Sequence, residues 1–194
     1  MRYILACSII LSVLASCSGS GDKKEPGKTE KEPVKKQSFF PVTSYIRGQI
    51  YEIKNGGINP LRHITANNHT DSSWVKMEEL EGAVKEFLTP EIDSTNMTTL
   101  FTEKNFLDQS IPAYTFTYEP AGQLPDTMKL RRWDVLIDAE SGKVKRIYLV
   151  KEINKNRTLQ LTWQGNKYCK LVSIATDDNG NSSVEREETI TWDL

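Results

Sequence analysis

The chain has 194 residues, of which 38% are hydrophobic, and its 25 basic and 26 acidic residues give a formal net charge of −1. This length and composition are typical of a globular chain with room for one folded domain. The near-neutral charge argues against nucleic acid as a partner, because a nucleic-acid-binding surface needs an excess of basic residues.

Residues 1–16 are predicted to be a signal peptide. Arg2 gives a short positive segment, and residues 4–15 form a run of apolar and small side chains. That run is too short to span a bilayer of about 30 Å, for which ~20 apolar residues are needed. Its length therefore favours a cleaved secretory signal over a membrane-spanning helix.

Small residues before a cysteine end this predicted signal peptide. Leu14, Ala15 and Ser16 precede Cys17, and this Leu-Ala-Ser-Cys pattern resembles the lipobox of bacterial lipoprotein precursors. The resemblance implies that the chain is cut before Cys17 and that its thiol is the lipid acceptor. Each buried methylene contributes about 0.8 kcal/mol, so two or three acyl chains hold a protein firmly to a membrane. The alternative is an ordinary signal peptide with an incidental cysteine.

The residues after Cys17 indicate a location and a tether. Ser18 stands where an aspartate retains lipoproteins in the inner membrane of Gram-negative bacteria, so the outer membrane is favoured. We expect the periplasmic face, with the cell surface as the alternative. Residues 17–37 are predicted to be the lipidated cysteine and a disordered tether, because their composition buries too little apolar area to offset the entropy of ordering. Residues 38–194 form the predicted folded domain.

Two helices are predicted at the start of this domain. The first covers residues 43–55, where Val42, Ile46, Ile50 and Ile53 recur at helical spacing before a pair of glycines. The second covers residues 73–88, with N-cap oxygens and an apolar stripe. The predicted caps are Asp71, Ser72 and Ser73, and the stripe is Trp74, Met77, Leu80, Val84, Phe87 and Leu88. Residues 60–65 are predicted as one strand between the two helices.

From residue 98 the apolar side chains recur with a period of two. Predicted turns at residues 138–142, 164–166 and 177–181 separate consecutive strands. The last strand is predicted to place five residues on one face, namely Val184, Arg186, Glu188, Ile190 and Trp192. This order predicts an α+β fold, in which two N-terminal helices pack on one face of an antiparallel β-meander of about six to eight strands.

Residues 133–144 carry a second resemblance. Their sequence, Trp-Asp-Val-Leu-Ile-Asp-Ala-Glu-Ser-Gly-Lys-Val, resembles the hairpin of PepSY-type domains, in which a strand ends in an Asp-x-x-x-Gly turn. Such domains occur in secreted and periplasmic proteins, and some are thought to inhibit or bind proteins. The order of elements is also similar to lipoproteins of the Bacteroidota type. That resemblance implies an envelope location and carries no activity over to this chain.

No catalytic residue, metal site or cofactor is predicted. His63, His69 and Asp71 lie close in sequence, but they lack the ligand spacing of a zinc site and are better explained as solvated loop residues. Cys169 is the cysteine that would remain besides the lipidated Cys17, so no internal disulfide is expected in the mature domain. A small buried hydrophobe is the expected role of Cys169, and a nucleophile is the alternative.

Three tryptophans of the predicted strands, Trp133, Trp163 and Trp192, are a possible ligand face for a glycan or a peptide. The favoured alternative is that they form a shared hydrophobic core against the helices.

These observations predict a non-enzymatic binding module anchored in the outer membrane. Its expected partners are the membrane, through the lipid, and an envelope protein or glycan. Two alternatives from other classes remain open. One is an envelope hydrolase whose site is built from scattered acids. The other is a carrier of a small apolar ligand, with a cavity lined by the three strand tryptophans.

Overall fold

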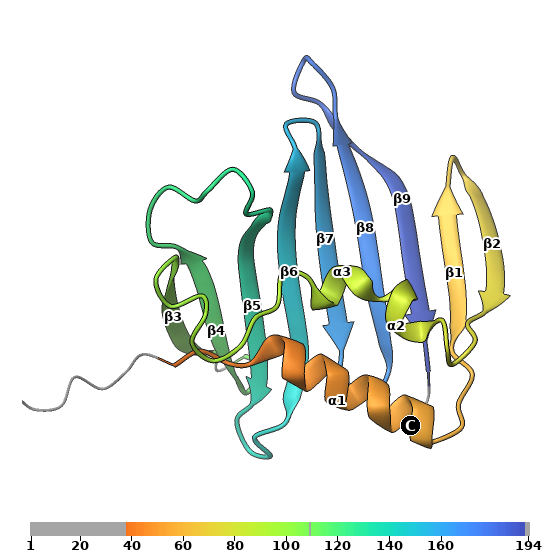
Figure 1. The fold of residues 1–194 in the computed structure, drawn as a ribbon, viewed down its shortest axis with the longest axis horizontal. Coiled ribbons are helices and arrows are strands. Elements are labelled where there is room, and N and C mark those ends of the chain that lie inside the picture. Colours follow the sequence, from red (N-terminus) through yellow and green to blue (C-terminus); the bar gives the residue numbers. More distant parts are fainter. Residues whose placement is uncertain (1–37, 109, 193–194) are drawn as a thin grey trace, which may run out of the picture. The chain divides into compact units, whose positions relative to one another are not determined.

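The computed structural model describes residues 38–108 and 110–192. The predicted signal peptide, the lipobox residues Leu14, Ala15 and Ser16, the predicted lipid acceptor Cys17 and the predicted tether lie outside these residues. In chain order the elements are α1 (Val42–Asn55), β1 (Leu61–Ala66), β2 (His69–Trp74), α2 (Leu80–Ala83), α3 (Lys85–Leu88), β3 (Phe101–Asp108), β4 (Ala113–Pro120), β5 (Leu130–Asp138), β6 (Val144–Asn154), β7 (Arg157–Gln164), β8 (Tyr168–Thr176) and β9 (Ser182–Thr191) (Figure 1).

Within these ranges, nine strands form one antiparallel sheet in the order β2-β1-β9-β8-β7-β6-β5-β4-β3. Strands β3 to β9 follow one another as a meander, and the β1–β2 hairpin is added beside β9, with Leu61 opposite Thr191 and Ala66 opposite Arg186. The predicted α+β class and antiparallel meander are confirmed. The sheet has more strands than the predicted six to eight, because the β1–β2 hairpin extends it past β9.

Helix α1 is the main helix and begins within one residue of its predicted start. Its side chains Val42, Ile46, Ile50 and Ile53 are buried against the sheet, as their spacing predicts. The helix ends at a pair of glycines, the second of which has a φ of 65°. That left-handed conformation favours glycine, because a Cβ would be strained there.

The second predicted helix is wrong in its first half. Of the predicted residues 73–88, the first two belong to strand β2 (His69–Trp74), residues 75–79 are not helical, and residues 80–88 contain the single turns α2 and α3. Asn67 and Asn68 have φ values of 51° and 60°, which makes a two-residue hairpin turn between β1 and β2. The predicted cap residues therefore pair with β1. Trp74, which was predicted to be buried in a helical stripe, is 69% exposed at the end of β2.

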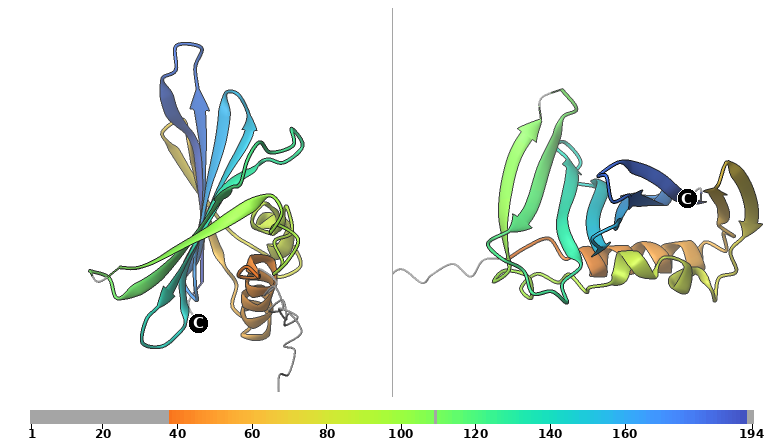
Figure 2. Two further views of the ribbon diagram at one scale, coloured as in Figure 1. Left: turned by 90° about the vertical axis from the view of Figure 1, so that its left-hand side faces the viewer. Right: turned by 90° about the horizontal axis from the view of Figure 1, so that it is seen from above.

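Helices α1, α2 and α3 all lie on one face of the sheet (Figure 2). The hydrophobic core lies between these helices and that face, which we call the helix-bearing face. No helix in the described ranges covers the other face, which we call the open face. Along the open face Asp134 is nevertheless buried, and it accepts hydrogen bonds from the Thr117 hydroxyl at 2.6 Å and the Arg132 guanidinium at 3.1 Å. Among residues 38–108 and 110–192, no helix is long and apolar enough to cross a membrane.

Candidate functional site

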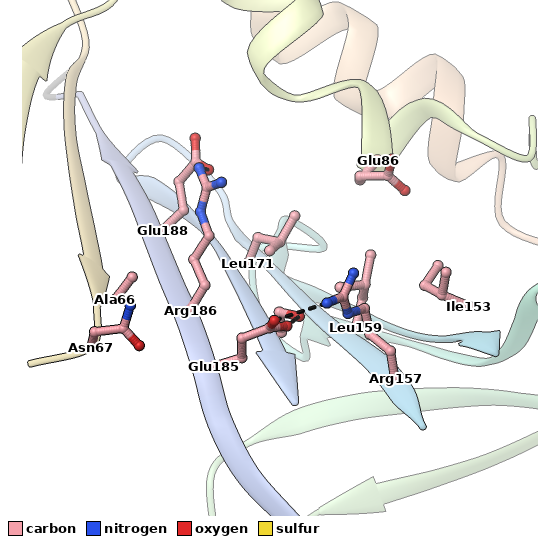
Figure 3. A pocket seen from close by; sticks show the side chains of 11 residues that line it. Ala66, Asn67, Glu86, Ile153, Arg157, Leu159, Leu171, Glu185, Arg186 and Glu188 are labelled. Atoms are coloured by element: carbon pink, nitrogen blue, oxygen red, sulfur yellow. Dashed lines mark hydrogen bonds and ion pairs between the residues drawn. The ribbon is translucent and has the colours of Figure 1, made fainter. Parts of the chain in front are cut away.

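The helix-bearing face of the sheet extends past the two short helices, and a pocket of about 590 Å³ lies there. In Figure 1 strands β7, β8 and β9 continue beyond α2 and α3. We call this pocket the β7–β9 groove (Figure 3). Its lining residues are Ala66, Asn67, Glu86, Ile153, Arg157, Leu159, Leu171, Ser173, Glu185, Arg186 and Glu188.

Strand register brings these side chains to one surface. Directly opposed residues of antiparallel strands point to the same face. One cross-strand row runs from Lys151 through Leu159 and Ser173 to Arg186. The neighbouring row runs from Leu149 through Leu161 and Leu171 to Glu188. Both rows begin in the core under the helices and end in the groove, so its apolar floor is a continuation of the core.

A β-bulge in β9 adds a further charge to the groove. Ser173 pairs with Arg186 and Ile174 pairs with Val184, so Glu185 is the extra residue. Bulged residues interrupt the alternation of a strand, and both Glu185 and Arg186 line the groove here. The bulge also moves Val184 to the open face. Its predicted place beside Arg186 and Glu188 is therefore wrong.

Five of the eleven lining residues are charged, with three acids and two bases. Arg157 donates to Glu185 at 2.8 Å, and Ser173 donates to the other carboxylate oxygen of Glu185 at 3.1 Å. Arg186 pairs with Glu188 at 2.6 Å. The side chains of Arg157 and Glu185 are 47% and 43% exposed, and exposed pairs of this kind contribute only about 0.2–1 kcal/mol. Arg157 and Glu185 can therefore exchange partners with a ligand at little cost.

The wall of the groove on the helix side is fixed by a buried lysine. The ammonium group of Lys151 donates to the backbone carbonyl of Glu86, and it lies 3.0 Å from the Glu86 carboxylate. Burial lowers the pKa of Lys151, and the Glu86 carboxylate partly offsets this effect. Because Lys151 belongs to β6 and Glu86 to α3, the contact holds α3 on the sheet beside the groove.

The three strand tryptophans do not form an exposed ligand face. Trp133 and Trp163 are fully buried and Trp192 is 3% exposed. Trp133 stacks on Tyr118 with ring centroids 4.6 Å apart, and Trp163 meets Phe87 of α3 edge-on at 5.4 Å. Strand alternation places all three on the helix-bearing face, where the helices cover them. The alternative interpretation, a shared hydrophobic core, describes their position.

The histidines and the cysteine do not assemble into a site either. His63 pairs with Ser72 and Thr189 on the open face, whereas His69 pairs with Ala66 on the helix-bearing face. No group of three His, Cys, Asp or Glu residues could hold a metal ion within the part of the chain that the structure describes. Cys169 is 2% exposed, and burial raises the pKa of its thiol, which disfavours the thiolate. The prediction of a small buried hydrophobe is confirmed for Cys169.

The hairpin that resembles PepSY-type domains forms the predicted turn. The Asp138 carboxylate accepts hydrogen bonds from the backbone and the hydroxyl of Ser141, both at 2.8 Å. These bonds, with the nearby Lys145 ammonium, hold the pKa of Asp138 far below its usual range. The turn lies at the opposite end of the strands from the β7–β9 groove, so Asp138 organises the hairpin and takes no part in the groove.

One sequence signal does point to the groove. In the last strand, Ile190 and Trp192 share a face with Arg186 and Glu188, so one face of one strand changes from apolar to charged. A strand face that changes in this way is covered along only part of its length. Arg157 and Glu185 carry no such signal, because only the bulge and the pairing of distant strands bring them together.

Comparison of the chain with protein-family models, with curated proteins and with solved structures finds no match.

Proposed function

We propose that the protein is a lipid-anchored binding module of the bacterial envelope, without catalytic chemistry, which holds a segment of another polypeptide in the β7–β9 groove. The observation that carries the proposal is an uncovered stretch of the core-facing side of the sheet, with leucines on its floor and charges of both signs around them. The expected lipid at Cys17 would keep the module at a membrane, with the outer membrane as the favoured location.

The chemistry of the groove favours a polypeptide over the other ligand classes. Leu159 and Leu171 offer an apolar contact for one side chain, while the arginines and glutamates offer donors and acceptors for peptide groups and for charged side chains. Sites for small apolar molecules are lined mainly by apolar residues, whereas nearly half of this lining is charged. Sugar rings stack on aromatic side chains, and no aromatic side chain of the described residues lines the groove.

Site-specific photo-crosslinking in the full-length protein, within its own envelope, tests this proposal. Leu171 and Val172 are consecutive residues of β8 that point to opposite faces, so they form a matched pair. We expect a photoreactive residue at position 171 to form a discrete, protease-sensitive adduct, and the same residue at position 172 to form none. Glu185→Arg should reduce the adduct, because it reverses one charge of the rim.

Two outcomes would contradict the proposal. Equal crosslinking at positions 171 and 172 would show that partners contact the groove no more than the opposite face of the sheet. An adduct at position 171 that resists protease and is released by a peptidoglycan-cleaving enzyme would assign the groove to the envelope polymer instead.

A further inference from the structure

Exposed apolar side chains gather at the end of the β3–β4 hairpin. The described residues include seven large hydrophobic side chains that are exposed, and four of them lie between residues 106 and 114. We call these four the apolar tip: Phe106 at 55% exposure, Leu107 at 47%, Ile111 at 47% and Tyr114 at 45%. The other three, Tyr51, Trp74 and Val184, are on separate elements. Single exposed hydrophobes are ordinary, but a contiguous cluster indicates an interaction surface.

The apolar tip is exposed on both faces of the sheet. Phe106 pairs with Thr115, and the next residue, Leu107, pairs with Tyr114. Because successive side chains of a strand point to opposite faces, Phe106 lies on the open face while Leu107 and Tyr114 lie on the other. A partner protein docked on one face would leave the other side uncovered. An apolar medium that surrounds the hairpin end would cover both faces at once, which is what a bilayer provides.

The folded domain also begins beside the apolar tip. Ser38 is the first described residue, and it lines a pocket together with Phe116 and Ile137. Ile137 is the direct cross-strand partner of Tyr114. The predicted tether, residues 18–37, would therefore join the domain close to the tip. A flexible chain of that length spans about 25 Å on average, so a lipid on Cys17 and the apolar tip can reach the same membrane surface.

Charges next to the apolar tip limit how deeply it can insert. Asp108 accepts hydrogen bonds from the backbone and the hydroxyl of Ser110, at 2.9 Å and 2.6 Å, and these bonds lower its pKa. The adjoining β5–β6 turn, which is joined to the tip by a hydrogen bond from Ala139 to Pro112, carries Lys143 and Lys145 as well as acids. Since a charged carboxylate is costly within the acyl chains, the expected depth is the headgroup region and the outermost part of those chains.

We propose that the apolar tip inserts into the surface of the lipid bilayer and so fixes the orientation of the domain on the membrane. The inference rests on the lipid anchor of the proposed function. It adds a second attachment, made by side chains of the folded domain. The β3–β4 loop and the β7–β9 groove lie at opposite ends of the antiparallel strands. Insertion of the tip therefore directs the groove away from the membrane, toward partners in the aqueous phase.

Fluorescence of a tryptophan in the apolar tip tests this inference. The full-length lipidated protein is reconstituted into vesicles of phosphatidylethanolamine and phosphatidylglycerol, with and without brominated acyl chains, which quench tryptophan in contact with them. Phe106→Trp places the reporter in the tip. Val184→Trp is the matched control, because Val184 is similarly exposed but lies at the groove end of the sheet. Both variants also carry Trp74→Phe, which removes the exposed native tryptophan.

We expect quenching of the reporter at position 106 to exceed that at position 184 several-fold, with a blue shift of its emission. Leu107→Ser added to Phe106→Trp should reduce both signals. Sedimentation of the same samples separates the two possible failures. Protein that sediments with the vesicles but shows equal quenching at both positions overturns tip insertion and leaves the anchor intact. Protein that does not sediment overturns the anchor, and the inference that rests on it.

Discussion

The helix-bearing face of the sheet has a covered half and an uncovered half, and single strands contribute to both. In β7, Trp163 is fully buried beneath α3, whereas Arg157, at the other end of the same face, is exposed in the β7–β9 groove. In β9, Ile190 is buried and Arg186 is exposed. The character of the side chain at each strand position therefore matches whether a helix covers that position. Where the helices cover the face the side chains are mainly aromatic or aliphatic, and beyond them charged side chains surround the leucines of the groove floor.

The largest effect is expected from Trp163→Ala, which removes a side chain from the centre of the covered half. The loss of contacts with Phe87 and Trp192 should reduce the free energy of unfolding by about 3–5 kcal/mol in urea denaturation. Trp163→Phe should cost clearly less, because the indole nitrogen of Trp163 has no hydrogen-bond partner in the described residues. Equal losses from the two variants would show that the polar edge of the indole ring carries the effect.

A matched pair of leucines compares the two halves directly. Leu161 and Leu171 are cross-strand partners on the same face, but Leu161 is fully buried and Leu171 is only partly buried. Leu161→Ala should cost about 2–5 kcal/mol and Leu171→Ala about 1 kcal/mol, measured by the same denaturation. Similar losses at the two positions would remove the distinction between the halves.

Lys151 lies at the border between the two halves, and its effect should depend on pH. Burial places its pKa in the folded state below that in the unfolded state. At alkaline pH below about 10.4 the unfolded state then binds more protons, so the contribution of Lys151 to stability rises with pH there. The wild type should gain stability relative to Lys151→Met as the pH approaches 10.4, by up to about 1.4 kcal/mol for each unit of pKa lowering. A constant difference across that range would contradict the prediction.

The sequence was sufficient for the elements that depend on local signals. The spacing of Ile46, Ile50 and Ile53 predicts α1, and the period of two with its turns predicts the meander. Strand β2 was missed because Asp71, Ser72 and Ser73 suit both a helix cap and a polar strand. Strand pairing decides between the helix and the strand for these residues. Strand β1 is hydrogen-bonded to β9 on one edge, and its other edge is free to pair with β2. No local pattern reports the pairing of β1 with β9, which lie far apart in the sequence.

The candidate site was less predictable for the same physical reason. The groove depends on where α2 and α3 end, and the predicted long helix would have placed that limit elsewhere. It also depends on the bulge at Glu185, because a shift of one residue moves a side chain to the other face. Alternation predicts that each strand tryptophan shares the apolar face of its strand, whereas its burial and the contacts with Phe87 and Phe101 require the packed structure.

The smallest effect on stability is expected from Asp138→Asn, because the β5–β6 turn lies outside both halves of the face. The pKa of the Asp138 carboxylate is lowered on folding, so its stabilising effect is present above the unfolded value near 3.9 and is lost as the pH falls toward the folded value. Asp138→Asn should lower the melting temperature slightly at neutral pH, and the difference from wild type should shrink below about pH 4. Asp178→Asn, in another hairpin turn, is the control. An Asp138→Asn effect that does not change with pH would contradict this account.

Strand β9 completes the sheet by joining segments that are far apart in the chain. It pairs with β1, and the hydroxyl of Thr191 bonds to the carbonyl of Leu61, 130 positions earlier. Contacts of such high contact order form late, because a long loop must close before they can stabilise anything. The β1–β2 hairpin can therefore take its place only after β9 has been synthesised and released. If the predicted signal peptide directs secretion, the sheet stays incomplete until its last strand has crossed the membrane.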